Sequence, residues 1–314
     1  MTEAYERAMA TSYANQKNHF TIPGSKLDKP IKNFIPGGIG SQVNGITSRI
    51  IDGGTEILFP TYYEPTLFAL RLTATRFGGL QGDVMSIRGV NYKNKSVRLF
   101  PNIWQPGGAN RAQNANLGPN GTIWLTRNGD RKFFVLAPPK NPELPQNTRG
   151  GKWNLSQIIS APNHDHGGNY SIDSALISND YRWLYTVEAT EDLNNWYFCQ
   201  YAIDQNMGLA RHQKRGIPGW LYGIGVRPGT KGFWFVTDYR SVEYAGVPHG
   251  IYCCDDGYNF ELKVKVKVKV KEIYGNGICF LHDGSALVTL DGQSLPGYVN
   301  GRPGRISYLP NCKF

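Results

Sequence analysis

The segment LKVKVKVKVK, residues 262–271, constrains the fold more than any other stretch of the chain. Its side chains alternate strictly, with Leu262 and the valines on one face and the lysines on the other. A period of two with β-branched residues on the apolar face is typical of a β-strand and excludes an amphipathic helix. At about 3.4 Å per residue the strand would be roughly 34 Å long, which exceeds most strands in globular domains.

Lysines occupy the polar face of this predicted strand, and the sequence leaves three interpretations of them open. They are Lys263, Lys265, Lys267, Lys269 and Lys271. On an edge strand, lysines prevent unwanted pairing with another strand, which is the interpretation we favour. The row could instead bind phosphate-rich surfaces such as lipopolysaccharide or nucleic acid, or it could pair with an acidic strand of another chain.

The segment just before this strand, CCDDGYNF, has the composition of a tight turn, because Asp side chains bond nearby backbone N–H groups and Gly257 supplies a positive φ. Its spacing also resembles the Asp-box of BNR-repeat β-propellers, Ser-x-Asp-x-Gly-x-Thr-Trp. The corresponding positions are Cys253, Asp255, Gly257, Asn259 and Phe260. Asp255 and Gly257 match, and the other three positions are substitutions. The resemblance implies a structural turn between the two outer strands of a blade; an ordinary Asp-Gly hairpin is the alternative.

Short apolar runs separated by turn residues recur along most of the chain. They lie at 57–59, 67–72, 84–87, 97–100, 123–125, 133–136, 175–177, 183–187, 196–201, 220–224, 233–236, 278–281 and 287–290. The chain also holds 37 Gly and 19 Pro, and no helical pattern alternates with the runs, which favours many short strands joined by turns. We therefore predict an all-β, propeller-like fold, with a pair of β-sandwiches or barrels as the alternative.

A weak internal repeat suggests the number of blades. Turn-like segments that end in an aromatic residue recur at Phe133, Trp196 and Phe260, which are 63 and 64 residues apart. The first two segments are degenerate, because Asn128 and Glu191 stand where the Asp-box has Asp, and Asp130 and Leu193 stand where it has Gly. A period of this length would fit about five blades into the all-β part of the chain.

The first part of the chain, residues 1–41, has a different character. We predict a short helix after Thr2 with Tyr5, Met9 and Tyr13 on its apolar stripe, followed by an extended arm rich in Pro and Gly. A three-turn helix is marginal alone and needs a surface to pack on. We therefore assign 1–41 to a docking helix and arm and 42–314 to the propeller-like domain; a helix folded back onto its own domain is the alternative.

Charge, cysteines and apolar runs bear on where the protein works. The net charge of +10 suggests an affinity for anionic surfaces, but the Lys and Arg residues outside the lysine strand are scattered, so we favour a solvated basic surface. Five cysteines without a metal-type spacing indicate reduced thiols formed in a cytoplasm. We find no signal-peptide pattern and no apolar run long enough to span a membrane, and we expect no membrane insertion.

No catalytic constellation emerges from the sequence. A BNR-type propeller raises the question of sialidase activity, but the Arg-Ile-Pro motif of that family is absent, and the nearest candidates, at Arg98 and Arg215, have the wrong spacing. His164 and His166 are weak metal-ligand candidates, for which a polar Gly-rich loop is the favoured interpretation. No phosphate-binding or dinucleotide-binding motif is present. We expect no catalytic residue, no metal and no cofactor, although a glycoside hydrolase stays open.

Several aromatic residues lie beside turns rich in Asn, Gly and Pro. They are Tyr62, Tyr63, Trp104, Trp153, Trp196, Tyr197, Trp220 and Tyr222. Such residues could stack on sugar rings or fill a protein interface, whereas core packing is the default expectation for most of them.

These observations lead to two hypotheses of different classes. The chain resembles, in general style rather than by a diagnostic motif, tailed-bacteriophage virion components such as tail, nozzle or receptor-binding proteins. The first hypothesis is therefore a non-enzymatic, homo-oligomeric virion protein, made in the host cytoplasm, which docks to other virion subunits and contacts a cell-surface glycan or lipopolysaccharide. The alternative is a lectin or a sialidase-like glycoside hydrolase on a β-propeller. A nucleic-acid binder ranks third.

Overall fold

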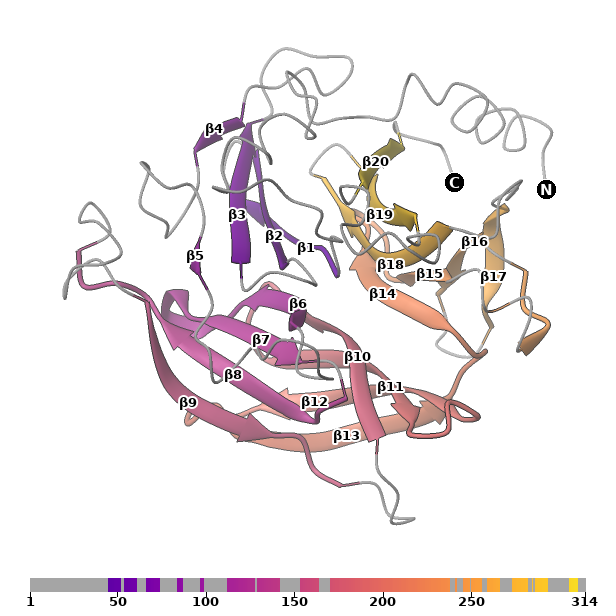
Figure 1. Ribbon diagram of the computed structural model, residues 1–314, viewed down its shortest axis with the longest axis horizontal. Coiled ribbons are helices and arrows are strands. Elements are labelled where there is room, and N and C mark those ends of the chain that lie inside the picture. Colours follow the sequence, from indigo (N-terminus) through magenta and orange to yellow (C-terminus); the bar gives the residue numbers. More distant parts are fainter. Residues whose placement is uncertain are drawn as a thin grey trace, which may run out of the picture.

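Figure 1 shows the computed structural model. The structure describes residues 45–51, 54–60, 66–73, 84–86, 97–98, 112–127, 129–141, 153–163, 170–237, 241, 245–248, 250–255, 259–265, 273–281, 284, 286–292 and 305–309. The strands in these ranges form antiparallel sheets, so the predicted all-β class is confirmed.

The strands fall into five sheets, which we call blades 1 to 5. Blade 1 contains β1 (Thr47–Ile51), β2 (Gly54–Pro60), β3 (Thr66–Thr73), β4 (Val84–Ser86) and β5 (Val97–Arg98). Blade 2 contains β6 (Ala112–Leu117), β7 (Ile123–Arg127), β8 (Lys132–Ala137) and β9 (Asn154–Ser160), with the 3-10 turn η2 (Pro119–Gly121) between β6 and β7. Blade 3 contains β10 (Tyr170–Ile177), β11 (Trp183–Thr190), β12 (Trp196–Ile203) and β13 (Leu209–Gly216). Blade 4 contains β14 (Leu221–Val226), β15 (Phe233–Thr237), β16 (Gly250–Cys254) and β17 (Glu261–Lys265). Blade 5 contains β18 (Ile273–Phe280), β19 (Ala286–Gly292) and β20 (Arg305–Leu309).

The first strand of each blade is its innermost strand, and the five blades form a ring around the centre of the molecule (Figure 1). Each inner strand contacts the next one along the chain, from β1 through β6, β10 and β14 to β18, and β18 contacts β1 again. Sequential up-and-down sheets arranged radially around one axis define a β-propeller. The predicted propeller-like fold of about five blades is therefore confirmed.

Glycines allow the inner strands to approach closely at the axis. A Cβ atom added to Gly223 of β14 would lie 2.6 Å from the Cα atom of Gly277 in β18, and Gly223 also has a positive φ of 42°. A Cβ atom added to Gly277 would in turn lie 2.5 Å from the backbone nitrogen of Ile46, just before β1. Side chains at these two positions would push β1, β14 and β18 apart.

Burial decreases from the inner to the outer strands, and the sequence pattern follows it. Leu221 to Gly225 of β14 are all buried, whereas β13, with the sequence LARHQKRG, is half-buried or exposed throughout. A strand covered on both faces needs a continuous apolar run, while an outer strand with one solvated face needs few apolar residues. The apolar runs in the sequence therefore mark inner and middle strands best.

Two apolar clusters join neighbouring blades. The cluster between blades 3 and 4 includes Trp196, Phe198, Trp220, Tyr222 and Phe235. Its rings pack in tilted and edge-to-face pairs, with centroids 5.4 Å apart for Trp196 and Trp220 and 5.6 Å apart for Phe198 and Phe235. A second cluster joins blades 2 and 3 through residues such as Trp124, Phe133 and Tyr201. The burial of these apolar side chains is the main favourable contribution to the packing of one blade against the next.

The aromatic repeat used to estimate the blade number does not mark equivalent positions. Phe133 and Trp196 follow turns between the second and third strands of their blades, whereas Phe260 follows the turn between the third and fourth strands of blade 4. The inner strands begin at Thr47, Ala112, Tyr170, Leu221 and Ile273, which gives spacings of 65, 58, 51 and 52 residues. Nearly constant spacing of the aromatic residues is thus a coincidence of loop lengths, even though the predicted number of blades is correct.

Some predictions fall outside the described residues. The docking helix with Tyr5, Met9 and Tyr13 does so, and with it the proposed division between residues 1–41 and 42–314. The lysine strand is described as far as Lys265, where β17 ends, and Lys267, Lys269 and Lys271 lie beyond. Within the described ranges, no helix has the length and apolar character needed to cross a membrane.

Candidate functional site

An open groove lies between blades 3 and 4, with a volume of about 1300 Å³ that includes space open to solvent. Three connections form its walls: the β11–β12 turn, the β13–β14 link and the β16–β17 turn. The lining residues are Asn194, Asn195, Trp196, Tyr197, Gly216, Ile217, Pro218, Asn259, Phe260 and Glu261. We call this feature the interblade groove.

Amides and one carboxylate supply the polar side of the interblade groove. Asn194, Asn195, Asn259 and Glu261 are all exposed. The Asn195 backbone closes the β11–β12 turn, because its N–H donates to the Thr190 hydroxyl at 3.0 Å and its carbonyl accepts from the Thr190 N–H at 3.0 Å. The rigid backbone therefore presents the Asn195 amide, which can both donate and accept hydrogen bonds.

The apolar side of the groove is built on the core between the blades. Tyr197, Ile217, Pro218 and Phe260 are half-buried there. Phe260 packs on Phe235 of the core, with ring centroids 5.4 Å apart. These side chains combine a fixed position with a partly open apolar surface.

The β11–β12 turn shares one hydrogen-bond arrangement with two other turns of the described structure. In each case a hydroxyl or thiol donates to the carboxylate two residues later: Ser178 to Asp180, Thr190 to Asp192 and Cys253 to Asp255. Backbone N–H groups donate to the same carboxylates in the first two turns, from Arg182 and Asn194. These hydrogen bonds lower the pKa of Asp180 and of Asp192, the first mainly through Ser178 and the second mainly through Thr190.

This turn design refines the interpretation of the predicted Asp-box. Cys253 donates to Asp255 at 3.1 Å, as the Ser of the box would, and the turn joins the two outer strands of blade 4. In the β11–β12 turn the equivalent residues are Thr190 and Asp192, so the alignment that placed Glu191 at the Asp position is wrong by one residue. With Asp192 at the Asp position, Asn194 stands at the Gly position, and the positive φ of this turn, 60°, belongs to Leu193, one residue earlier. Gly257 lies outside the described residues, so the complete box stays a prediction.

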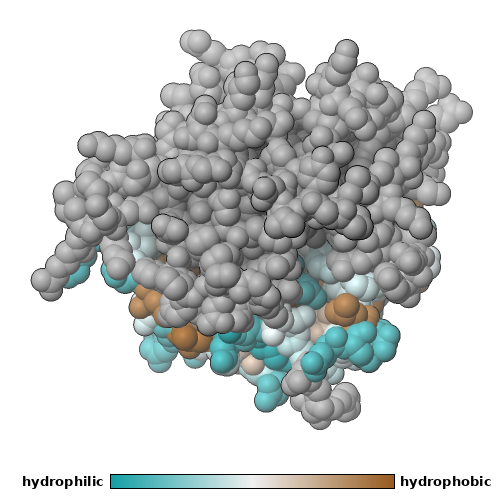
Figure 2. Space-filling view, in the orientation of Figure 1, coloured by the Kyte–Doolittle hydropathy of each residue, from teal (hydrophilic) through white to brown (hydrophobic). Residues whose placement is uncertain are grey.

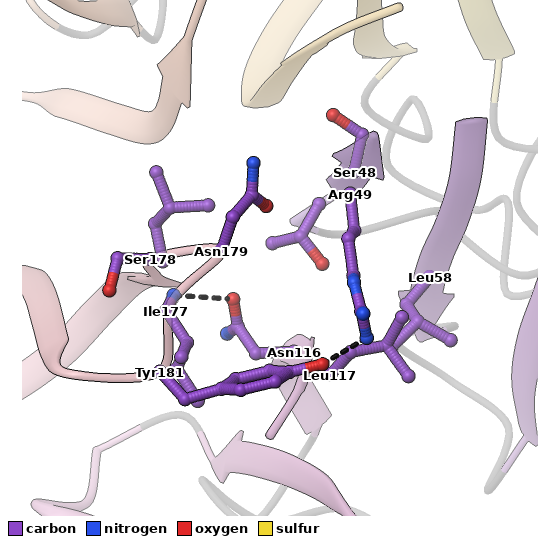
Figure 3. A pocket seen from close by; sticks show the side chains of 11 residues that line it. Ser48, Arg49, Leu58, Asn116, Leu117, Ile177, Ser178, Asn179 and Tyr181 are labelled. Carbon is purple, nitrogen blue, oxygen red and sulfur yellow. Dashed lines mark hydrogen bonds between the residues drawn. The ribbon is translucent and has the colours of Figure 1, made fainter. Parts of the chain in front are cut away.

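A second, smaller hollow lies where the ends of β1, β6 and β10 converge near the axis (Figure 3). Its volume is about 290 Å³, including space open to solvent. Arg49 of β1 donates to the hydroxyl of Tyr181, which follows β10, and the guanidinium carbon lies 5.1 Å from the centre of the Tyr181 ring. Asn116 of β6 accepts from the Ile177 N–H at 3.1 Å and donates to the Ala175 carbonyl at 3.1 Å. We call this feature the axial pocket.

A buried ion pair links blades 2 and 3 away from both of these openings. The Glu188 side chain has no exposure and lies 3.5 Å from the Arg131 guanidinium. It also accepts hydrogen bonds of 2.6 Å from the Thr186 and Tyr201 hydroxyls. Burial, followed by the charge of Glu188, raises the pKa of Tyr201. Because solvent does not reach Glu188, we assign this cluster to stability rather than to chemistry on a substrate.

The cysteines of the described part are reduced and buried. They are Cys199, Cys253, Cys254 and Cys279. Burial raises the pKa of Cys253 and of Cys279 to about 12. Thiols with such pKa values stay protonated near neutral pH and are poor nucleophiles. These four cysteines form no disulfide, and the cytoplasmic origin of the protein stays a prediction.

The structure gives different outcomes for the other residues singled out in the sequence. Lys263 lies in β17 and pairs with Glu261 two residues earlier, and its side chain is 24% exposed. Trp196, Trp220 and Tyr222 are buried in the core between blades, as the default expectation held. His164 and His166 lie outside the described residues. Among the residues described, no three His, Cys, Asp or Glu side chains cluster in a way that could hold a metal ion.

The sequence identifies Asn259 and Phe260 of the groove as turn residues, but it does not identify the other polar residues of both openings. Arg49, Asn116, Asn179 and Tyr181 belong to no recognisable motif, and only the fold brings them together. Asn194 and Asn195 did carry a signal, because an Asn pair beside an Asp turn and before Trp196 is typical of an exposed loop on an aromatic core.

The described outer surface offers little else that could bind a ligand or partner. Figure 2 shows that its visible part is mainly hydrophilic, with small separate apolar areas. The large apolar side chains exposed in the described ranges are Ile158, at 50%, and Val226, at 44%. Isolated residues of this kind are normal on a soluble surface and do not indicate a docking patch.

The fold and the two openings thus define a five-bladed β-propeller with a groove between two blades and a pocket near the axis. No family model and no curated protein matches the sequence. Solved structures do resemble it. A GH43_1 enzyme from Xanthomonas citri is 13% identical with a TM-score of 0.48, and the match covers 98% of this chain and 93% of that one. A gluconolactonase from Xanthomonas campestris is 9% identical with a TM-score of 0.47, over 86% of this chain and 77% of that one.

A third similar structure is longer than this chain. It is a Lactobacillus plantarum protein, 11% identical with a TM-score of 0.41, and the match covers 77% of this chain but 58% of that protein. At such identities the likeness concerns the fold alone. Membership of the Asp-box family and the resemblance to virion proteins therefore stay predictions.

Proposed function

We propose that the protein binds a neutral glycan in the interblade groove, as a lectin does, without cleaving it. The observation that carries this proposal is the combination of exposed amides with half-buried apolar side chains along one groove. A sugar ring has hydroxyl groups around its edge and apolar C–H faces, so it needs both kinds of partner. Few charged groups line the groove, which favours a neutral ligand over an anionic one.

The groove residues divide into two sets with different roles. Phe260 and Pro218 offer apolar contact to the face of a sugar ring, and their positions are fixed by packing on blade 4 and by the β13–β14 link. Asn195 offers its amide at the rim, and an amide can bond two neighbouring hydroxyls. The Asn194 Nδ2 donates to the Asp192 carboxylate at 2.8 Å, so Asn194 offers mainly its amide oxygen. Preorganised side chains of this kind reduce the entropy lost on binding.

The carboxylates of the groove support the proposal that the glycan is bound without being cleaved. Hydrolysis of a glycosidic bond commonly requires two carboxyl groups on opposite sides of that bond. Glu261 is the one Asp or Glu among the residues described as lining the groove, and it is paired with Lys263. We therefore assign the groove to recognition, which keeps the lectin part of the alternative hypothesis and sets its hydrolase part aside.

A glycan array followed by calorimetry on the best ligand tests the proposal. We expect Asn195→Ala to weaken binding about tenfold, because it removes an amide but keeps the backbone bonds of the turn. Asn206→Ala is the matched control: Asn206 is exposed in the β12–β13 turn, at the other end of the same strand, and its backbone N–H makes the turn bond. Equal loss in both variants, or no binding by the wild-type protein, would reject the proposal. Turnover of a fluorogenic glycoside panel would reject the non-catalytic part.

The virion hypothesis concerns the partners of the protein, and it is compatible with glycan binding in the interblade groove. It depends largely on residues 1–41, which the structure does not describe, and on the overall style of the sequence. A glycan-binding propeller is compatible with a receptor-binding role in such an assembly. Electron microscopy of the purified protein with the other proteins of its gene neighbourhood would test it, and a strictly monomeric species that ignores all of them would count against it.

A further inference from the structure

Strand β9, the outer strand of blade 2, differs from other outer strands in its charge. In the described sheet it pairs with β8, and Figure 1 shows it on the outside of the ring. Its sequence is NLSQIIS, and the chain contains no charged residue from Trp153 to Asn163. The outer strands of blades 3, 4 and 5 each contain Arg or Lys, with the sequences LARHQKRG, ELKVK and RISYL. Because charged side chains on an edge oppose the addition of another strand, β9 is the edge of these four that lacks this protection.

The backbone of β9 alternates between residues that bond to β8 and residues that point outward. The Ala161 N–H donates to the Arg131 carbonyl at 3.0 Å, so these two residues form a hydrogen-bonded pair. In an antiparallel ladder such pairs alternate with pairs whose backbone groups point away from each other. Along this register Ile159 also bonds to β8, whereas Ile158 and Ser160 direct their N–H and C=O groups to the outer side of the sheet.

The side chains beside these outward groups allow another strand to approach. Ile158 is 50% exposed, and Ser160 is exposed and small. A register shift near Ser156, whose hydroxyl donates to the Val135 carbonyl at 3.0 Å, interrupts β9 closer to its start. Such a bulge limits how much of an edge can pair. The segment 157–161 after the bulge is regular, and it is therefore the part that can accept a further strand.

The charge of the protein indicates which strand fits this edge. Each copy of the chain carries a net charge of +10, so two copies repel each other least where no charged side chain lies at the contact. Pairing of two cationic edges such as β13 or β17 would place like charges opposite each other, which is destabilising. Pairing of β9 with β9 avoids this repulsion. In an antiparallel pair centred on Ile159, Ile158 of one copy lies opposite Ser160 of the other, so each outward donor meets an acceptor.

We infer that the protein forms a homodimer in which the β9 strands of two copies pair antiparallel and join two propellers through one sheet. This interface belongs to blade 2 and does not depend on glycan binding between blades 3 and 4. Two short strand edges bury less area than a standard protein–protein interface, so we expect a weak dimer with a Kd of about 10 µM to about 1 mM. Salt screens the repulsion between the two net charges, so the dimer should become tighter as ionic strength rises.

Sedimentation equilibrium of the full chain, together with amide exchange measured by NMR, tests this inference. We expect the average mass to rise from monomer toward dimer as protein concentration increases to about 1 mM, and to rise more in about 0.5 M NaCl than in about 0.05 M. Exchange of the Ile158 and Ser160 amides should slow as the dimer forms, because their N–H groups become bonded. A monomer at every concentration would overturn the inference. Slow exchange of both amides in the monomer would also overturn it, since another part of the same chain would then cover the edge.

Variants locate the contact. Ile158→Lys should weaken the dimer at least about tenfold, because it brings two cations together at the paired edge. Val226→Lys is the matched control: Val226 ends β14 and is 44% exposed, so the same charge enters at a similarly exposed apolar position away from β9.

A second variant tests the backbone rather than the side chain. Ser160→Pro removes an outward N–H group and leaves the bonds between β9 and β8 in place, and proline is tolerated at such edge positions. It should also weaken the dimer, while the thermal midpoint stays within about 2 °C of the wild-type value. Retention of the wild-type Kd by Ile158→Lys or by Ser160→Pro, or an equal loss in Val226→Lys, would overturn the inference.

Discussion

Glu188 is the residue on which the junction between blades 2 and 3 depends most. Its carboxylate is fully buried, forms an ion pair with Arg131 and accepts hydrogen bonds from the hydroxyls of Thr186 and Tyr201. Removing one partner of a buried ion pair leaves the other charge without compensation, so the loss exceeds the worth of the pair itself. We expect Glu188→Ala to lower the free energy of unfolding by about 3–5 kcal/mol.

Urea denaturation of the purified variants measures this effect. Glu191→Ala provides the control, because Glu191 is exposed in the following turn, and its change should stay within about 0.5 kcal/mol. A loss below about 1 kcal/mol for Glu188→Ala would show that the pair does not hold the blades together.

Cys279 and Cys253 give the protein a predictable response to high pH. Burial raises the pKa of both thiols from 9.0 to about 12 in the folded protein. Between these values the unfolded chain has lost the thiol protons while the folded protein keeps them, so the free energy of unfolding falls as pH rises from about 9 to about 12. The stabilising contribution is fully present below pH 9. Denaturation midpoints measured across this range should decline, and Cys279→Ala should decline less steeply; a flat profile would contradict the assigned burial.

At the scale of single residues, the sequence allowed the turn chemistry to be predicted but not the sites. Asp255 and Cys253 could be placed in a turn because their bonds are local. Arg49 and Tyr181 are 132 positions apart, and no local pattern records that a propeller brings them together. Glu188 carried no signal in the sequence, because a charged side chain in a strand is rarely buried.

At the scale of a secondary-structure element, the outer strand of blade 4 shows where the first part of the lysine row lies in the sheet. In the described sheet, β17 pairs with β16 and is the last strand of its blade. Leu262 packs against the core cluster between blades 3 and 4, as the alternating pattern predicted. The position of β17 at the edge of its sheet therefore agrees with the edge interpretation of the lysine row. The residues after Lys265 lie outside the described residues, and their role stays a prediction.

Replacing Lys265, Lys267 and Lys269 with Thr should cause self-association on the edge interpretation, because unpaired strand edges join when charge no longer prevents it. Size-exclusion chromatography with light scattering measures the result. The control replaces Lys140, Arg182 and Lys231 with Thr, which removes the same charge from exposed positions outside the strands. Unchanged size together with lost binding to an anionic surface would favour the anion interpretation instead.

Strands differ in how well the sequence marked them, for a physical reason. Middle strands such as β8 and β15 are buried on both faces and appear as apolar runs. Outer strands such as β9 and β13 are mostly polar and were missed, because their backbone pairing needs only one partner strand and little burial. The pattern of apolar runs thus predicted the class of the fold better than it predicted which strands belong to each blade.

At the scale of the whole molecule, the close approach of β14 and β18 holds blades 4 and 5 together at the axis. Gly223→Ala should lower the free energy of unfolding by about 2–4 kcal/mol, since the new Cβ atom meets the backbone of Gly277 and Ile278 and φ is positive. Gly216→Ala is the control, because a Cβ atom there meets nothing within 4 Å. Thermal and urea denaturation should separate the two variants, and equal stability would contradict the tight axis.

The interblade groove is the place where we propose that this propeller binds a glycan. Hydrogen–deuterium exchange with and without the tightest-binding glycan of the array tests it most directly, because it locates the ligand without any mutation. We expect slower exchange in residues 194–197, 216–218 and 259–261, which come from three separate connections and meet only at the groove. Slower exchange confined to other segments, or no glycan bound at all, would contradict it.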